Sequence, residues 1–184
     1  MRSTDADDKR ARFEALALPL MTPLYNVALR LTGHREDAAD AVQDTFYRAY
    51  RTFDGFRPGT NARAWMFTIL YSVVINRRKK AQHEAQDVSI DLLPQISAAQ
   101  PDARRSEPAG VEEPEVEAAL RSLPHAFREA VVLVDLEDLS YEDAAAVVGC
   151  PVGTLRSRLF RGRRLLAEAL REYAHRVGHL RRTQ

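Results

Sequence analysis

The side chains best equipped for chemistry lie between Ser140 and Arg164. There, arginine, serine and phenylalanine recur at positions that share one side of a helix. A guanidinium group can form two hydrogen bonds with guanine or bind a phosphate, and hydroxyl and aromatic groups reach neighbouring bases. The chemistry predicted for this stretch is therefore the recognition of duplex DNA. The candidate residues are Arg156, Ser157, Phe160, Arg161 and Arg164.

The same stretch contains the signals of two short helices joined by a tight turn. Ser140, followed three residues later by Asp143, is typical of a helix start. Gly149 permits the backbone to end that helix, and Pro151 favours the start of the next one. The apolar side of the second helix is predicted to be buried and comprises Leu155, Leu159, Gly162 and Leu166. The pattern predicts a helix-turn-helix; the alternative is a surface helix with scattered arginines.

Charge is segregated along the chain. The 184 residues carry a formal net charge of only +1. Nevertheless, residues 151–184 contain nine arginines and two glutamates, and residues 82–117 contain nine acidic residues and two arginines. Such asymmetry favours a basic working surface and a separate acidic segment. The length suits two small domains.

Several classes of function lack the residues that they need. Cys150 is the only cysteine, so neither an intrachain disulfide nor a cysteine-based zinc cluster can form. The five histidines are scattered, and no glycine-rich phosphate loop is present. No apolar run is long enough to cross a membrane, and the N-terminus has no signal-peptide core. We therefore expect a cytoplasmic protein, not an enzyme, without cofactor, metal or membrane insertion.

The first third of the chain predicts two helices. Apolar residues recur at helical spacing from Phe13 to Leu31, with an expected break at Pro19 and Pro23, after a polar and frayed start. A second helix over 36–53 has one clear core stripe. Its opposite face is either solvated or a contact surface, and that face presents Asp40, Gln43, Asp44 and Tyr47.

A third helix is predicted from a turn over 54–61, with Thr60 as its cap, to about Lys80. It is apolar on two sides. Such a helix is either sandwiched in a bundle or meets a partner, and aromatic rings beside basic residues suit the stacking of unpaired bases. The sequence leaves both interpretations open. The residues concerned are Trp65, Phe67, Tyr71, Ser72, Arg77 and Arg78.

The fold class predicted is all-α, with two small helical domains. The first spans residues 1–81 as a bundle of three to four helices. An acidic, flexible linker follows over 82–111, because helical periodicity is lost there and prolines and acids dominate. The second domain, 112–184, contains four short helices including the helix-turn-helix.

The order of motifs resembles a known family. REDAADAVQDTFYRAY, GTNARAWMFTIL, an acidic linker, LPHAFREAVVLVDLEDLSYEDAAAVVG and PVGTLRSRLFRGRRLL follow one another along the chain. This order is similar to that of the bacterial sigma-70 family, specifically its small extracytoplasmic-function (ECF, group IV) sigma factors. The resemblance implies a subunit that binds core RNA polymerase and directs it to promoter DNA. It further implies sigma region 2 in the first domain and region 4 in the second.

The resemblance also implies roles for the candidate residues. Asp40, Gln43, Asp44 and Tyr47 match the part of region 2 that binds polymerase. The helix-turn-helix face from Arg156 to Arg164 matches the part that reads the upstream (−35) element as duplex. The stretch from Trp65 to Lys80 matches the part that captures the melted −10 element. Tyr71 and Ser72 stand where many members have an Arg-Asn pair, so the −10 preference departs from the common one.

Two further expectations follow. A free factor of this kind would act constitutively, so we expect an anti-sigma factor that covers its apolar and basic faces, in a stress or envelope response. The alternative is a stand-alone helix-turn-helix regulator that binds duplex DNA. That alternative would show a ligand pocket or a dimer contact in the first domain rather than a polymerase-binding face.

Overall fold

The computed structural model describes residues 2–87 and 114–176. Within these residues every regular element is helical, which confirms the all-α class. We call residues 2–87 the first domain and residues 114–176 the second domain. The predicted linker lies mostly outside the described residues, and its boundaries stay predictions.

The first domain contains four α-helices. In chain order its elements are α1 (Arg2–Ala17), the 3-10 turn η1 (Leu18–Leu20), α2 (Met21–Thr32), α3 (Arg35–Thr52), the 3-10 turn η2 (Phe53–Gly55) and α4 (Ala62–Asp87). The expected break near Pro19 is confirmed, because η1 interrupts the helix there. The expected frayed start was wrong: helix α1 begins at Arg2, and Phe13 anchors it in an edge-to-face cluster with Phe46, Tyr50 and Phe53.

The ends of the helices in the first domain are set by local residues, and one predicted helix cap was wrong. Gly33 ends α2 in the left-handed conformation at φ 79°, as a glycine does at little cost. At the start of α4 the predicted cap was wrong, since the Asn61 side chain, not Thr60, accepts from a first-turn amide, that of Ala64, at 3.1 Å. Helix α4 also continues seven residues past Lys80, into the stretch assigned to the linker.

The second domain contains five α-helices and one wider turn. Its elements are α5 (Pro114–Ser122), α6 (His125–Val131), the π-helical turn η3 (Val132–Leu136), α7 (Tyr141–Val148), α8 (Val152–Ala169) and α9 (Arg171–Arg176). The stretch between Pro124 and Glu137 is thus α6 followed by a π turn. This wide turn closes with the amide of Glu137 donating to the carbonyl of Val132 at 3.1 Å.

Helices α7 and α8 form the predicted helix-turn-helix. The Ser140 hydroxyl accepts from the amide of Asp143 at 3.0 Å, and Gly149 ends α7 at φ 68°. Gly162 lets α8 approach α6 closely, because a Cβ there would lie 2.8 Å from the Val131 side chain and 3.1 Å from the Phe127 carbonyl. The predicted buried side of α8 is therefore explained by packing against α6.

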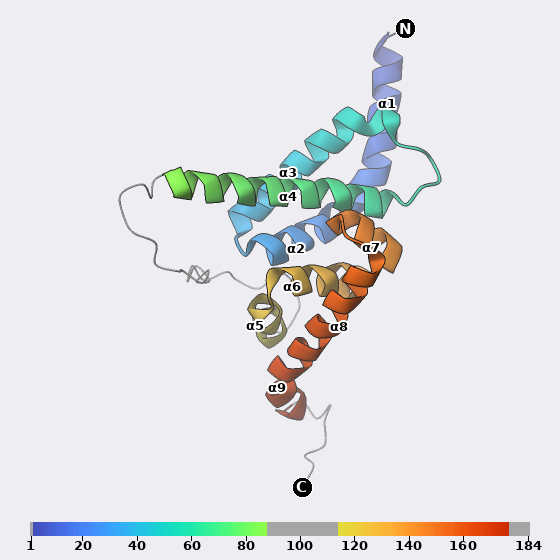
Figure 1. The fold of residues 1–184 in the computed structure, drawn as a ribbon. Coiled ribbons are helices and arrows are strands. Elements are labelled where there is room, and N and C mark those ends of the chain that lie inside the picture. Colours follow the sequence, from blue (N-terminus) through green and yellow to red (C-terminus); the bar gives the residue numbers. More distant parts are fainter. Residues whose placement is uncertain (1, 88–113, 177–184) are drawn as a thin grey trace.

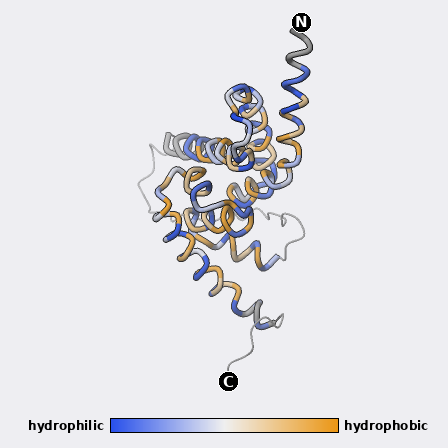
Figure 2. Tube along the Cα trace, turned by 90° about the vertical axis from the view of Figure 1, so that its right-hand side faces the viewer, coloured by the Kyte–Doolittle hydropathy of each residue, from blue (hydrophilic) through white to orange (hydrophobic). Residues whose placement is uncertain are grey.

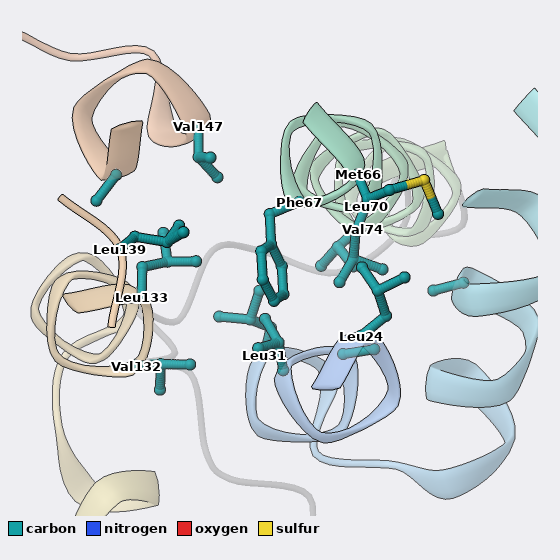
Figure 3. Close-up of a cluster of buried hydrophobic side chains, with 14 of the residues drawn as sticks. Leu24, Leu31, Met66, Phe67, Leu70, Val74, Val132, Leu133, Leu139 and Val147 are labelled. Carbon is teal, nitrogen blue, oxygen red and sulfur yellow. The ribbon is translucent and has the colours of Figure 1, made fainter. Parts of the chain in front are cut away.

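The two domains share one hydrophobic core. Helix α4 crosses the molecule and contacts α2 and α3 of the first domain and α7 of the second (Figure 1). Phe67, only 1% exposed, extends from α4 toward Leu31 of α2, and Leu133 and Leu139 of the second domain lie to one side of it (Figure 3). We call this contact between the domains the interdomain seam. Of the two interpretations for α4, the sandwiched one holds in this structure.

The hydropathy of the chain also places the core where the two domains meet. Apolar stretches gather in the middle of the molecule, where helices of both domains pack, whereas α1 and α9 extend from opposite ends (Figure 2). The core of the molecule thus lies along α4, and the candidate residues are distributed around that helix and along α8.

Candidate polymerase and nucleic-acid interfaces

The predicted DNA-reading face of α8 is open to solvent. Leu155 and Leu159 are buried against the rest of the second domain, which turns the opposite side of the helix outward. All five predicted residues on that side are exposed, and they are Arg156, Ser157, Phe160, Arg161 and Arg164. Phe160 is 69% exposed, an unusual position for a phenylalanine without a binding role.

Intramolecular contacts distinguish the arginines of α8 from one another. Arg163 forms two hydrogen bonds with Asp135 at 3.0 and 2.6 Å, and this pairing raises the pKa of its guanidinium. The Arg156 guanidinium lies over the Tyr141 ring, 5.3 Å from its centroid, and keeps its hydrogen-bond donors available. Arg163 is thus held within the second domain, whereas Arg156 presents its charge outward.

The predicted polymerase-binding residues share the outer face of α3. Asp40, Gln43 and Tyr47 are exposed, and Asp44 is partly exposed. Tyr47 is 62% exposed, with the Arg51 guanidinium 5.6 Å from its ring centroid. Together they form one polar surface that includes an exposed aromatic ring.

Arg77 joins this surface, which sequence reasoning did not foresee. From α4 it reaches across to α3, where it lies 2.7 Å from Asp44 and 3.5 Å from Asp40. The hydrogen bond with Asp44 is the main cause that raises the pKa of Arg77. A residue predicted for the −10 element therefore lies among the predicted polymerase contacts. No local sequence signal reveals this contact, because it joins residues more than thirty positions apart.

The other predicted −10 residues lie on two opposite sides of α4, Trp65 and Ser72 on one and Phe67, Tyr71 and Arg78 on the other. Trp65 packs against Phe56, with ring centroids 4.8 Å apart, at the first turn of the helix. Phe67 and Tyr71 face the interdomain seam, where Phe67 is buried and Tyr71 half-buried. Ser72 and Arg78 are exposed. The structure therefore does not bring these side chains together into one platform.

Polar pairs cross the interdomain seam. The Tyr71 hydroxyl donates to Glu129 at 2.8 Å, and burial together with that carboxylate raises the pKa of Tyr71. Arg30 bonds Glu117 at 2.9 Å, with both side chains almost fully buried. Arg30, Glu117 and Glu129 are buried charged residues. The helical periodicity of the sequence predicted no site at any of them.

Arg63 and Glu137 form a third pair across the seam. Glu137 directly follows the π turn η3 and is buried. Desolvation is the main cause that raises the pKa of Glu137, and Arg63 opposes it. A fourth pair is more exposed, with the amide of Asn61 donating to Asp143 at 2.8 Å.

Two cavities flank the candidate surfaces of the first domain. One, of about 580 Å³, lies between α2 and α3 beside Gln43 and is lined mainly by apolar groups that include Met21, Tyr25 and Phe46. The other, of about 570 Å³, lies between α1 and the turn before α4, against Phe53 and Phe56. The only sequence signal for the second cavity was the pair of phenylalanines around the Asp54–Gly55 turn.

Among the described residues, no three His, Cys, Asp or Glu side chains are grouped closely enough to hold a metal ion. None of the described helices combines the length and the apolar character needed to span a membrane. Fold and surfaces together define a class: a two-domain helical protein with a helix-turn-helix and a separate polar contact face.

Comparison with known proteins gives the family. The Sigma-70 region 2 family model matches residues 16–84, and the Sigma-70 region 4 model matches residues 114–166. The chain is 40% identical over 153 residues to the ECF RNA polymerase sigma factor EcfG of Rhodopseudomonas palustris, covering 83% of this chain and 82% of the relative. It is 37% identical to the ECF RNA polymerase sigma factor SigE of Mycolicibacterium smegmatis, covering 82% of this chain and 58% of the relative.

Solved structures agree. The sigma factor RpoE of Bartonella quintana, in complex with the anti-sigma factor NepR, matches with a TM-score of 0.71 and 33% identity over 87% of this chain and 97% of that one. CnrH, in complex with the cytosolic domain of CnrY, matches with a TM-score of 0.63 and 25% identity over 92% of this chain and 94% of that one. The chain therefore belongs to the sigma-70 family, and within it to the ECF RNA polymerase sigma factors, which direct promoter-specific transcription initiation.

Proposed function

We propose that this sigma factor reads the −35 element with the outer face of α8. The observation that carries the proposal is the exposure of all five predicted residues on that face, with Phe160 69% exposed among arginines. Arginine forks bond guanine edges in the major groove, and an exposed ring can contact thymine methyl groups. Arg164 is placed to bind a phosphate, which fixes the helix in register without reading sequence.

We propose that the α3 face binds core RNA polymerase. Asp40, Gln43, Asp44 and Tyr47 form a continuous polar surface there, and Arg77 braces two of its acids. The apolar cavity beside Gln43 adds a place for a partner's hydrophobic side chain. Aromatic residues such as the exposed Tyr47 are enriched at protein interfaces.

For the melted −10 element we propose Trp65, Phe67, Tyr71, Ser72 and Arg78 as contacts once α4 is uncovered, with Arg77 at the edge of the polymerase face. Ser72 and Arg78 are already exposed, and Tyr71 offers a ring on which a base can stack. The cavity against Phe53 and Phe56, next to Trp65, has an aromatic lining suited to a planar base. The factor works without its own catalysis, as an initiation subunit in the cytoplasm.

A regulator is part of the proposal. One similar solved structure holds a sigma factor with an anti-sigma factor, and another holds CnrH with the cytosolic domain of a partner protein. By that similarity we propose an anti-sigma factor for this chain, in a stress or envelope response. Co-purification from the native host tests this: polymerase with a small inhibitor is expected, and polymerase alone would contradict it.

The direct test of the function is reconstitution. The purified chain is added to core bacterial RNA polymerase and a pool of genomic fragments, and transcript starts are mapped. Starts that share an upstream element are expected, and they should weaken with Arg161→Ala. Binding to duplex fragments without any association with polymerase would instead favour a stand-alone regulator.

A further inference from the structure

A third cavity, of about 330 Å³, lies where α2, α3 and α4 meet α6. Its apolar lining includes Leu31 and Val74, whose side chains are buried. Its charged and titratable lining consists of Asp37, Arg77, Arg78 and His125. The volume lies within the range of small-molecule sites, about 300–1,000 Å³. The proposed function uses two of these arginines individually and assigns no role to the cavity.

Positive charge beside this cavity is only partly neutralised. Arg78 lines it and forms no hydrogen bond or ion pair within the described residues. Close to Arg78, the Arg128 side chain donates to three backbone carbonyls, those of Arg30, Arg121 and Leu123. Burial lowers the pKa of Arg128, and the charges of Arg121 and Arg78 lower it further. An anion held by Arg78 would reduce this repulsion among guanidinium groups.

His125 contributes a buried atom that is available for a further hydrogen bond. Its Nδ1 lies 2.6 Å from a carboxylate oxygen of Glu129, which also accepts from the Tyr71 hydroxyl. Its Nε2 is buried and has no hydrogen-bond partner in the described part of the chain. Both nitrogens of an imidazolium ring donate, so Nε2 can bond an anionic oxygen inside the cavity. A ligand there would satisfy an atom that the protein leaves unpaired.

The remaining lining groups favour one kind of anion. Asp37 is an exposed carboxylate of α3, which repels further phosphate groups but accepts hydrogen bonds from hydroxyl groups. Acidic side chains bind ribose hydroxyls in this way in nucleotide sites. Leu31 and Val74 provide apolar surface for a ring. Arg77 is held at the wall of the cavity by Asp44, at 2.7 Å. The groups present thus suit a single phosphate, a sugar and a base.

We propose that this cavity binds a ribonucleotide that carries a single phosphate group, with the phosphate at Arg78 and Nε2 of His125 and the ribose hydroxyls at Asp37. The site goes beyond the proposed function, because neither promoter reading nor polymerase binding requires a small molecule. A DNA strand offers the same phosphate chemistry. The free nucleotide is favoured because a chain of phosphates would also meet the carboxylates of Asp37 and Glu129.

The first experiment measures binding directly. The full chain is titrated by calorimetry with each of the four ribonucleoside 5′-monophosphates. We expect at least one of them to bind at a single site, and its nucleoside, which lacks the phosphate, to bind at least about tenfold more weakly. Inorganic phosphate should compete, because it occupies the same part of the cavity. If none of the four monophosphates binds, the inference is wrong.

A pair of variants tests the position of the phosphate. Arg78→Gln removes one guanidinium group from the cavity and should weaken binding of the nucleotide about tenfold. Arg48→Gln is the matched control, because it makes the same change at an exposed position on α3 that does not line the cavity. Circular dichroism verifies that both variants are folded. Equal affinities in the two variants would contradict the site.

Nuclear magnetic resonance of a histidine-labelled chain locates the ligand. The ring signal of His125 is assigned through its loss in His125→Gln. Saturating nucleotide should shift this signal in wild type, because Nε2 gains a partner. A nucleotide that binds without shifting the signal would overturn the assignment.

A titration with random single-stranded DNA 12-mers tests the other source of phosphate. The 12-mers carry a fluorescent label, and anisotropy gives their affinity. If they lose affinity in Arg78→Gln while no monophosphate binds wild type, Arg78 contacts the DNA backbone and the nucleotide site is refuted. If the monophosphate binds and the 12-mers do not displace it, the cavity is a site for the free nucleotide.

Discussion

The outer face of α8 and the seam-facing side of α4 carry similar side chains, but the first is exposed to solvent and the second is largely buried. Each combines aromatic rings with arginines and hydroxyl groups, yet Phe160 is 69% exposed and Phe67 is 1% exposed. The difference lies in the neighbours. Helix α8 packs on one side only, whereas α4 has helices of the first domain on one side and the second domain on the other. Similar residues can therefore form an open reading face or a covered one, depending on the packing of the helix.

The comparison suggests a division of labour. The proposed duplex-reading face on α8 is already exposed in this structure, so binding of an intact double helix there needs no rearrangement. On the side of α4 that we propose for the melted −10 strand, Phe67 is buried and Tyr71 is bonded to Glu129 of the second domain.

The largest effect is expected at the most buried seam pair. Glu117→Ala leaves the Arg30 guanidinium, 4% exposed, without its carboxylate, which costs the closed form about 3–5 kcal/mol. The domains should separate, because opening hydrates Arg30, and the radius of gyration should rise. Glu115→Ala, at an exposed position on the same helix, should leave the radius unchanged. A compact Glu117→Ala chain would show that the apolar part of the seam alone holds the domains.

The next effect separates arginines on α8. Arg161→Ala should weaken binding to a −35 duplex by about 1–3 kcal/mol, because it removes a base-reading fork. Arg163→Ala is the control, since that side chain is held by Asp135. Anisotropy with labelled duplexes measures both. Equal losses on specific and scrambled duplexes would reduce Arg161 to a phosphate contact.

A packing change tests what supports the open face. Gly162→Ala should destabilise the second domain by about 1–2 kcal/mol, because its Cβ would meet Val131 at 2.8 Å and the Phe127 carbonyl at 3.1 Å. Gly153→Ala, also on α8, meets nothing within 4 Å and should be neutral or stabilising. Urea unfolding compares the two. Equal stabilities would mean that α6 and α8 readjust freely and do not fix the reading face.

The smallest effect concerns pH. The pKa of Glu137 is raised in the closed form, mainly by burial. Its contribution to stability is therefore complete below the ordinary pKa of a glutamate and is lost as pH rises through the raised pKa. Wild type should lose stability relative to Glu137→Gln across that acidic-to-neutral window. Parallel thermal unfolding curves at several pH values measure the difference, and a constant difference would contradict burial as the cause.

Local signals in the sequence predicted most of the fold. The break near Pro19, the glycine end of α7 and the Ser140 cap were correct because each depends on residues a few positions apart. The cap of α4 was assigned to Thr60 but is Asn61, because both side chains can cap a helix and the path of the turn decides between them. In the structure the Thr60 hydroxyl donates to the Arg57 carbonyl, and the Asn61 side chain accepts from the Ala64 amide. The start of α1 was missed because tertiary contacts of Phe13 support a polar segment.

The candidate surfaces also differ in whether they depend on local signals or on contacts between distant residues. The α8 face was predictable from a helical wheel, because one neighbouring helix defines one buried side. The burial of Phe67 could not be predicted in this way. A helical wheel shows that α4 is apolar on two sides, but it does not show which helices cover the second side. Arg77 and Tyr71 find partners 33 and 58 residues away. Such contacts arise from how domains pack, on which residue spacing carries no information.

The most direct test of the central claim measures the distance between the domains in the free chain and in the holoenzyme. Spin labels are placed at Thr68→Cys on α4 and Glu142→Cys on α7, both exposed positions, in a chain that carries Cys150→Ser. Because α4 and α7 are in contact, electron–electron resonance should give one short distance for the free chain. With core polymerase bound, that distance should lengthen into a separate population. The same distance in both states would contradict a covered strand-capturing surface that polymerase exposes.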